Sequence, residues 1–313
     1  MTRFNTLATA TLFQTQLDEA AVQTSLTGWM ENNAGQVIYN GGAEVKIPIM
    51  STQGLGNYDR DKGYKSGKIT LKYETKTMTQ DRGRSFSLDA MDVNETNFVA
   101  TASRTMGIFQ RESVTPEIDA YRISALATAA INNGNKNVVY GYTPAESTIV
   151  KEIKKGIAKI RDNGYNGRLM IHITSTAKLE LELALGKQLS TVTFSKDGVD
   201  MTVPAIDGNP LIETPQNRMW TAIKINDGES HSQEDGGYAK GVSAKDINFL
   251  IVPENVPVAI SKQDKMRIFD PDTNQKANAW AFDYRRFHDL WVLDNKLNSI
   301  YLNIKDPESP EAA

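Results

Sequence analysis

The sequence contains no cysteine, which excludes disulfide bonds, thiolate catalysis and cysteine-ligated metals. A strong excess of charge is also missing, since the net charge of −3 creates no basic field that would favour nucleic-acid binding. No apolar run is long enough for the core of a signal peptide or for a bilayer span. We therefore expect a soluble, globular protein that folds in the cytosol, and 313 residues suffice for about two domains.

Nucleotide-binding motifs are scarce as well. Gly54-Leu55-Gly56 begins like a dinucleotide fingerprint, but Asp59 stands at the third glycine position and no helix follows. Gly63 and Gly67-Lys68 resemble a phosphate loop only loosely, because the spacing is one residue short and Ile69 replaces the Ser or Thr that binds Mg²⁺. We expect both stretches to be plain, glycine-rich loop.

The three histidines do not form a recognisable site. His172 lies in an apolar strand and is expected to be a core or interface residue. His288-Asp289 has no second histidine-rich partner for a metal. The third histidine, His231, lies in a polar loop with Glu229, Glu234 and Asp235. This group could bind a cation weakly, but a solvated loop is the favoured interpretation. No elbow around a nucleophilic serine and no zinc-protease motif occurs, so the chain is not expected to be an enzyme, and no catalytic, cofactor or metal residue is predicted.

The most prominent element predicted is a helix over residues 91–131. Asp92 and Glu95 have the spacing of a capping box, and apolar residues then recur at helical intervals. Thr115-Pro116-Glu117 restarts the helix with proline at its first position, and Asn133-Gly134 ends it. The pattern predicts one long helix or two nearly coaxial ones, with a length of about 60 Å.

The first 40 residues read as an arm rather than as a domain. They are rich in Thr and Gln, and their apolar face is thin, so the segment needs another surface to lie on. A loose tail is the alternative. Trp29 and Met30 favour a docking arm, because both side chains would otherwise lie in water.

Residues 41–90 are expected to form a long β-hairpin. Residues 45–50 and 69–77 alternate with a period of two, and a polar, glycine-rich tip separates them. Residues 81–84 (DRGR) break the pattern, which resumes at Phe86 and Leu88. So little apolar content does not form a core of its own, and the economical cover is another copy of the chain.

The remaining chain predicts a compact α/β lobe over 138–252, followed by a second sheet over 253–305 and a loose, acidic tail over 306–313. Within the lobe, helices are expected over 148–163 and 175–187, and strands over 168–174, 191–194, 199–203, 211–213, 219–225 and 247–252. The second sheet is expected from strands over 258–261, 266–269, 280–287, 290–293 and 299–304.

Two charged stretches remain open in function. The DRGR stretch at 81–84 could bind phosphate or form ion pairs between subunits. The helix over 148–163 carries a row of lysines that could touch nucleic acid, although interspersed acids favour a solvated face.

The order of elements resembles the major capsid proteins of tailed bacteriophages, with their Hong Kong 97-type α+β fold. The local sequence is similar to that of the phage capsid proteins of Gram-positive hosts at YDRDKGY (58–64), LKYET (71–75), DRGRSF (81–86), MDVNET (91–96) and FQRESVTPEIDAYR (109–122). Weaker similarity follows at RRFHD (285–289) and DNK (294–296). These are habits of a family rather than catalytic motifs, so they support a fold and a structural role.

The resemblance implies a shell subunit with an N-terminal arm (1–40), an extended loop (41–90), a spine helix and return strands in a peripheral domain (91–137 and 253–305), and an axial domain (138–252). It implies pentamers and hexamers in an icosahedral head around double-stranded DNA, assembled in the host bacterial cytoplasm. Residues expected at contacts between subunits are Trp29, Met30, Tyr58, Arg60, Lys62, Tyr64, Lys65, Arg82 and Arg84.

The resemblance further implies portal, scaffold and possible decoration proteins as partners, non-specific contact with packaged DNA, and no membrane. Some relatives carry a leader that is cleaved, so we expect either a separate scaffold or a processed form here. Lys–Asn crosslinks between subunits occur in some relatives, but no complete set of residues for one is identified. An encapsulin-type nanocompartment is the alternative shell, and an α/β enzyme around His172 or His231 is the alternative from another class.

Overall fold

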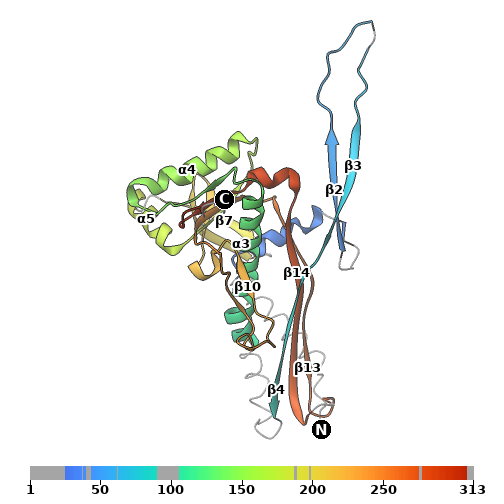
Figure 1. Cartoon of the computed structure of the whole chain (residues 1–313), viewed down its shortest axis with the longest axis vertical. Helices are drawn as coiled ribbons and strands as arrows, with labels where there is room; N and C mark the ends of the chain where they lie inside the picture. Colours follow the sequence, from blue (N-terminus) through green and yellow to red (C-terminus); the bar gives the residue numbers. More distant parts are fainter. Residues whose placement is uncertain are drawn as a thin grey trace, which may run out of the picture.

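The structure, a computed structural model, describes residues 25–36, 38–39, 44–61, 63–89, 106–186, 189–196, 199–274 and 277–308. An α/β lobe lies beside the upper part of an elongated three-stranded sheet, here called the strip (Figure 1). A β-hairpin projects beyond the upper end of the strip. Residues 1–24 of the expected arm and residues 91–105 of the expected helix lie outside the described residues.

The lobe is built on a seven-stranded sheet in the order β5-β15-β12-β6-β9-β8-β7. The two central strands, β12 (Ile247–Pro253) and β6 (Leu169–Ile173), are buried along their whole length, as continuous apolar runs predict for strands covered on both faces. The others are β5 (Val138–Val139), β15 (Tyr301–Ile304), β9 (Asn209–Glu213), β8 (Val199–Ile206) and β7 (Ser190–Lys196).

Helices cover both faces of this sheet. On one face, α4 (Glu146–Asp162) and α5 (Ser175–Leu185) pack on Leu169, Ile171 and Phe249. On the other face, α3 (Thr115–Asn132) packs on Met170 and Leu250. The alternating side chains of β6 and β12 thus feed two separate cores, as the period of a strand requires.

The predicted helix boundaries in the lobe are close to those observed. The isoleucine row of α4 is buried as predicted, and it comprises Ile149, Ile153, Ile157 and Ile160. Thr174 caps the start of α5, where its side chain accepts a hydrogen bond from the Ala177 N–H, and Gly186 follows the last residue of the helix with φ of 53°.

The spine helix runs without interruption from Met106 to Asn132 in the described residues, and its end at Asn133-Gly134 is as predicted. The expected restart at Thr115-Pro116 is instead a π turn (Gln110–Val114) inside the helix. Its wide turn is closed by the Thr115 N–H, which donates to the Gln110 carbonyl. Pro116 explains this geometry, because it has no N–H and its ring would collide with the carbonyl four residues earlier.

The strip consists of a three-stranded antiparallel sheet in the order β13-β14-β4. Strand β14 (Ala279–Val292) is central and β13 (Pro257–Phe269) is one edge, and each is one long strand where two short ones were expected. Strand β4 (Gln80–Asp89) is the other edge, paired with β14 from Gln80 opposite His288 to Asp89 opposite Ala279.

The course of β4 corrects two predictions. Residues 81–84 do not break a strand but lie inside β4, where a Cβ on Gly83 would lie 2.9 Å from the Tyr284 carbonyl oxygen. The hairpin does not extend over 41–90 either, because only β2 (Glu44–Thr52) and β3 (Ile69–Thr77) pair with each other, with β1 (Ile38–Tyr39) on β2. Sequence adjacency suggested one hairpin, whereas β4 pairs with a strand about 200 residues later.

The C-terminal part also differs from prediction. Strand β15 was expected in the second sheet, but it joins the lobe, antiparallel to β12 and parallel to β5. Of the tail expected to be loose, 306–308 is attached, since the Asp306 carbonyl accepts the Gly141 N–H at 3.0 Å. Residues 309–313 lie outside the described part. The strand expected over 219–225 is only β10 (Ile223–Ile225), paired with β11 (Tyr238–Lys240), with short 3₁₀ turns at Gln216–Arg218 and Asp294–Ser299.

Candidate assembly interface

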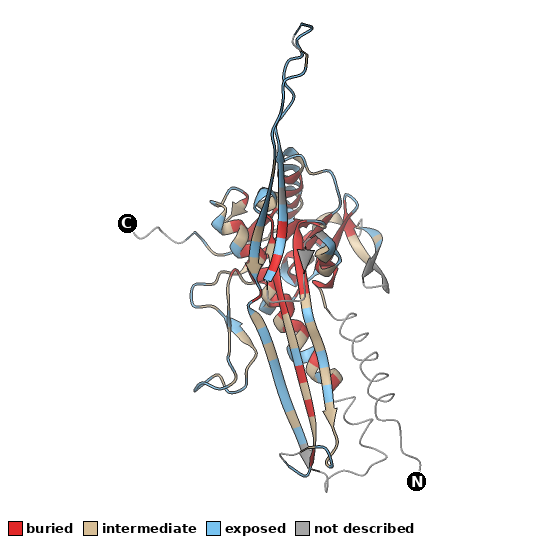
Figure 2. Cartoon of the chain, turned by 90° about the vertical axis from the view of Figure 1, so that its right-hand side faces the viewer, coloured by how far each residue is buried: buried red, intermediate tan, exposed pale blue. Residues whose placement is uncertain are grey.

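The β2–β3 hairpin is the most exposed part of the described chain, and Figure 2 shows it standing almost entirely in solvent. The Tyr64 side chain is 91% exposed. Other large apolar side chains along the hairpin are also exposed, namely Met50, Leu55, Tyr58, Ile69, Leu71 and Tyr73. A run of uncovered apolar groups of this kind marks an interaction surface.

The tip of the hairpin has a defined local structure. The Gly63 N–H donates to the Asp59 carbonyl at 2.7 Å, and Gly63 has φ of 74°, which glycine adopts without strain. The Tyr58 and Tyr64 rings are in contact, with centroids 5.0 Å apart and planes tilted by 60° to each other. This arrangement presents two aromatic rings on an ordered turn, which lowers the entropic cost of binding.

Basic residues also lie in the tip sequence, at positions 60, 62 and 65. Arg60 and Lys65 are exposed, and Lys65 packs its aliphatic stem over Gly56. Lys62 lies outside the described residues. Contact of the tip residues with another subunit stays a prediction.

The root of the hairpin is anchored in the body of the subunit. Val45, Ile47 and Met78 are buried in one cluster with Val258 and Ile260 of β13 and with Leu293, the residue after β14. The hairpin is therefore a projecting arm on a packed root, and its outer part is available for a partner.

Trp29 and Met30 correct the prediction that they contact another subunit. They lie in a 3₁₀ segment (Gly28–Gln36) and are only 2% and 0% exposed, in the core that α3 shares with the large sheet. The Trp29 ring stacks on His172 at a centroid distance of 6.1 Å. Side chains already covered by their own chain have no area to offer to a neighbour, so residues 25–36 belong to the subunit core.

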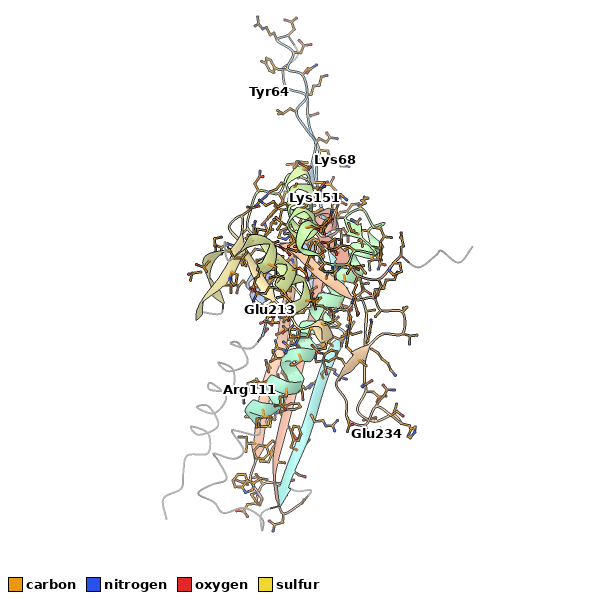
Figure 3. All side chains as sticks on the ribbon, turned by 90° about the vertical axis from the view of Figure 1, so that its left-hand side faces the viewer. Tyr64, Lys68, Arg111, Lys151, Glu213 and Glu234 are labelled. Atoms are coloured by element: carbon orange, nitrogen blue, oxygen red, sulfur yellow. The ribbon has the colours of Figure 1, made fainter. Side chains whose placement is uncertain are left out.

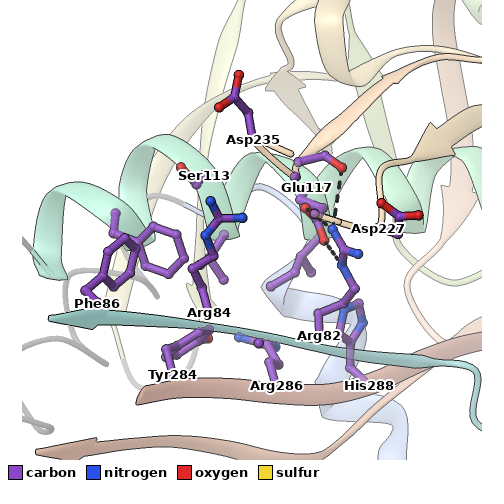
Figure 4. A pocket seen from close by; sticks show the side chains of 17 residues that line it. Arg82, Arg84, Phe86, Ser113, Glu117, Asp227, Asp235, Tyr284, Arg286 and His288 are labelled. Carbon is purple, nitrogen blue, oxygen red and sulfur yellow. Dashed lines mark hydrogen bonds and ion pairs between the residues drawn. The ribbon is translucent and has the colours of Figure 1, made fainter. Parts of the chain in front are cut away.

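The two arginines predicted at subunit contacts lie on β4 beside α3 (Figure 4). The Arg82 guanidinium makes a two-pronged ion pair with Glu117, at 2.8 and 3.2 Å, and donates to the Asn226 carbonyl at 2.8 Å. Arg82 thus stabilises its own subunit, and its contact with another subunit stays a prediction. Arg84 is exposed and donates to the Glu234 carbonyl at 3.1 Å, so its contact with another subunit stays a prediction.

A cleft of about 270 Å³ lies between β4, the π turn and the 227–237 loop. Its charged groups mostly serve the local fold. Asp227 accepts bonds from the Ser230 hydroxyl and from the N–H groups of Glu229 and Ser230, which lower its pKa to about 2. His231, in the same loop, is almost fully exposed. Within the described residues, no group of three or more His, Asp or Glu side chains could hold a metal ion.

Sequence reasoning missed a set of buried ion pairs around α3. Arg122, only 1% exposed, pairs with Glu31, and Arg286 bridges Glu31 at 2.9 Å and Asp264 at 2.7 Å. Burial raises the pKa of Glu31, but the neighbouring charges of Arg122 and Arg286 outweigh this effect and hold it below its ordinary value. These ion pairs thereby connect residues 25–36 to helix α3 through Arg122 and to the strip through Arg286.

Two further carboxylates fix the same helix. Asp119 is fully buried and accepts hydrogen bonds from the N–H groups of Leu26 and Thr27 at 3.0 Å and from Arg218 at 2.9 Å. Asp289 accepts the Tyr121 hydroxyl at 2.6 Å. The only sequence signal was charge inside the apolar stripe of the helix, at positions 119 and 122.

His172 is buried, which confirms that it is a core residue, and His288, for which burial was not predicted, is buried as well. His172 shares a hydrogen bond of 3.1 Å with the Thr214 hydroxyl. Burial and nearby arginines lower the pKa of His288 well below its ordinary value, so it is neutral at neutral pH. In the described part of the chain, no helix has the length and apolar character needed to cross a lipid bilayer.

No protein-family model and no curated protein matches the chain. Solved structures do. The capsid of cyanophage P-SCSP1u matches with a TM-score of 0.51 and 10% identity, covering 84% of this chain and 83% of that chain. The mature capsid of bacteriophage PhiM1 matches with a TM-score of 0.51 and 10% identity over 85% and 83%. A structure from Mycobacterium phage Che8 gives 0.50 and 11% over 82% and 84%. The chain has the Hong Kong 97-type fold of tailed-phage capsid proteins.

Proposed function

We propose that this chain is the major capsid protein of a tailed bacteriophage. Copies of it assemble through pentamers and hexamers into an icosahedral head that encloses double-stranded DNA. The observation that supports this proposal best is the projecting hairpin: the described residues leave the apolar side chains of its outer part uncovered, while its root is firmly packed. A capsid fold with such an arm is suited to many modest contacts, which closure of a shell makes sufficient.

In this proposal the strip and α3 form the peripheral domain, and the lobe forms the axial domain. The lobe then comprises residues 138–252 together with β15, whose pairing places it in the large sheet. The hairpin of one subunit lies over its neighbour and contributes Tyr58, Arg60, Lys62, Tyr64 and Lys65. Arg84 lies on the exposed edge of β4 as a further contact residue.

The proposal includes the partner proteins of a tailed-phage head. They are a scaffold protein, a portal and, in some heads, a decoration protein. The protein is then a virion component, assembled in the cytoplasm of the host bacterium. Contact with packaged DNA is non-specific, in keeping with the small net charge. Catalysis is not part of this function.

Electron microscopy of the expressed protein tests the proposal. We expect closed particles or ring-shaped capsomers, with or without a co-expressed scaffold. A protein that stays monomeric under all of these conditions contradicts the proposal. Nucleic-acid content then separates the two kinds of shell, because a phage head packages DNA whereas an encapsulin-type compartment encloses protein cargo.

A further inference from the structure

Two helices of the lobe present complementary surfaces to solvent. The exposed side of α4 carries four lysines, here called the lysine face: Lys151, Lys154, Lys155 and Lys159. The exposed side of α5 carries two leucines flanked by two acids, here called the leucine–glutamate face: Leu179, Glu180, Glu182 and Leu183.

The leucine–glutamate face exposes two leucines at positions where a helix facing only solvent would carry polar residues. Leu179 and Leu183 lie one turn apart and are 54% and 55% exposed, whereas Ala177 and Leu181 already bury the other side of α5 in the core. Glu182 beside them keeps 48% of its side chain exposed and pairs only distantly with Lys178, at 3.5 Å. An exposed leucine pair with acids beside it suits a protein surface that is basic and partly aliphatic.

The lysine face has this composition. It extends over about 12 Å along α4, at 1.5 Å per residue from Lys151 to Lys159. Lys154 and Lys155 keep more than half of their side chains exposed even though they pair with Asp207 and Glu152. Lysine stems can lie on leucine side chains while their ammonium groups reach carboxylates.

Among the described residues, no ion pair joins the two faces within one subunit: Lys154 and Lys155 pair with Asp207 and Glu152, and Glu182 pairs with Lys178. Both helices pack on the same side of the large sheet, but α4 runs along the upper edge of the lobe and α5 along its left edge in Figure 1. Figure 3 views the lobe from the side of these helices and labels Lys151 on α4. Contact between faces on two different edges of one subunit is head-to-tail, and repetition of it around an axis closes a ring.

We infer that the lysine face of one copy packs on the leucine–glutamate face of the next copy around a ring. The partner is therefore a second copy of this chain. This inference rests on the proposed shell function, which requires rings of copies. It adds the pair of surfaces that holds neighbouring lobes together, and both charge and apolar burial contribute to it.

Charge reversal and its rescue test the inference. We expect Lys151→Glu with Lys155→Glu to lower the assembled fraction at least about tenfold, because like charges then face each other. Glu180→Lys with Glu182→Lys should cause a similar loss. Combining all four substitutions should restore assembly to within about threefold of the wild type. Sedimentation velocity at about 0.1 M salt measures the assembled fraction, since higher salt screens the interaction.

Matched controls separate assembly from folding. Lys265→Glu, an exposed lysine of β13, should leave assembly unchanged, and circular dichroism should show each variant folded like the wild type. The pairing is overturned if the variant with all four substitutions has no larger assembled fraction than either double variant. It is also overturned if the Lys151→Glu, Lys155→Glu variant assembles normally. If particles of that variant form normally but contain less DNA, the lysines contact DNA rather than a neighbouring subunit, and the proposed pairing is overturned. If the wild type itself forms no rings or particles, the shell function fails, and this inference fails with it.

Discussion

At the scale of single residues, burial separates two kinds of aromatic side chain in this chain. Trp29 is enclosed by α3 and the large sheet, whereas Tyr64 stands in solvent on the hairpin tip. Both were predicted to contact another subunit, Trp29 because it would otherwise lie in water and Tyr64 because its loop resembles that of phage capsid proteins. The structure assigns the first to folding and leaves the second for a partner.

The first prediction compares these two rings. Trp29→Ala should destabilise the subunit by about 3–5 kcal/mol, because it leaves a cavity in a closed core. Tyr64→Ala should leave the free energy of unfolding within about 0.5 kcal/mol of the wild type and lower the assembled fraction. Urea unfolding of dissociated subunits and light scattering measure the two effects. A reversed pattern would contradict the assignment of residues 25–36 to the core.

A second residue-scale prediction concerns Glu31. Replacing it with Gln removes the charge that faces Arg122 and Arg286, both of which are buried more deeply than Glu31 itself. We expect Glu31→Gln to cost about 2 kcal/mol at pH 7. Glu229→Gln, at an exposed carboxylate of the 227–237 loop, is the control and should cost almost nothing.

The pH dependence of this cost has a definite sign. The pKa of Glu31 is lower in the folded chain than its ordinary value of 4.5, so the carboxylate stabilises the fold at pH values above 4.5. This stabilisation is lost as the pH falls through the folded-state pKa. The difference between the wild type and Glu31→Gln should therefore be constant above pH 5 and shrink below pH 4.5 in urea titrations. A difference that grows on acidification would show that Glu31 is not the group involved.

At the scale of elements, β4 shows how pairing overrides a local pattern. The DRGR stretch interrupts the alternation, yet the strand continues because Gly83 lets the backbone pass close to β14. The two charged residues before Gly83 form ion pairs with other elements: Asp81 pairs with Arg285 of β14, and Arg82 pairs with Glu117 of α3. The DRGR stretch, which looked like a break in the sequence pattern, is thus part of the edge strand β4, and its charges form ion pairs.

A substitution at Gly83 tests this account. Gly83→Val should destabilise the subunit by about 2 kcal/mol or more, because its Cβ would lie 2.9 Å from the Tyr284 carbonyl oxygen. Gly54→Val is the matched control, since a Cβ at Gly54 meets nothing within 4 Å. Thermal unfolding of the dissociated subunits compares the two. Equal midpoints would mean that β4 does not pair with β14 in solution as it does here.

At the scale of the whole molecule, the body and the hairpin have separate roles. Buried ion pairs and two apolar cores hold the body together, while the outer hairpin contributes nothing to either core. Folding and assembly should therefore be separable by removing the outer hairpin alone. The cleft beside β4 and the buried histidines do not change this division, because their side chains serve contacts within the subunit.

Deletion of residues 54–65 is the corresponding prediction. The shortened hairpin should leave the thermal midpoint of the subunit nearly unchanged, since the root cluster around Val45, Ile47 and Met78 is intact. The assembled fraction in electron micrographs should fall to background. Replacing the same residues with a Gly/Ser linker of equal length controls for loop length and should also block assembly. If the deletion unfolds the subunit, the hairpin belongs to the core and the proposed architecture is wrong.

Much of the fold followed from the sequence alone. The row of isoleucines in α4, the apolar runs of β6 and β12, and the glycine at the end of α5 predicted these elements within a few residues. The exposed, alternating hairpin was predicted for the same reason. Each of these signals is local, because the periodicity of burial and the chemistry of caps and turns depend on neighbouring residues.

The tertiary structure alone decided what joins distant parts of the chain. Strand β4 pairs with β14, β15 joins the lobe, and Trp29 lies against His172, all across large separations in sequence. The roles of the charges on Glu31, Asp119 and Arg122 can be understood only from the partners that the fold places beside them. Periodicity shows that a face is buried but not against what, since strand pairing and ion pairing are set by the competition among all segments of the chain for the same core.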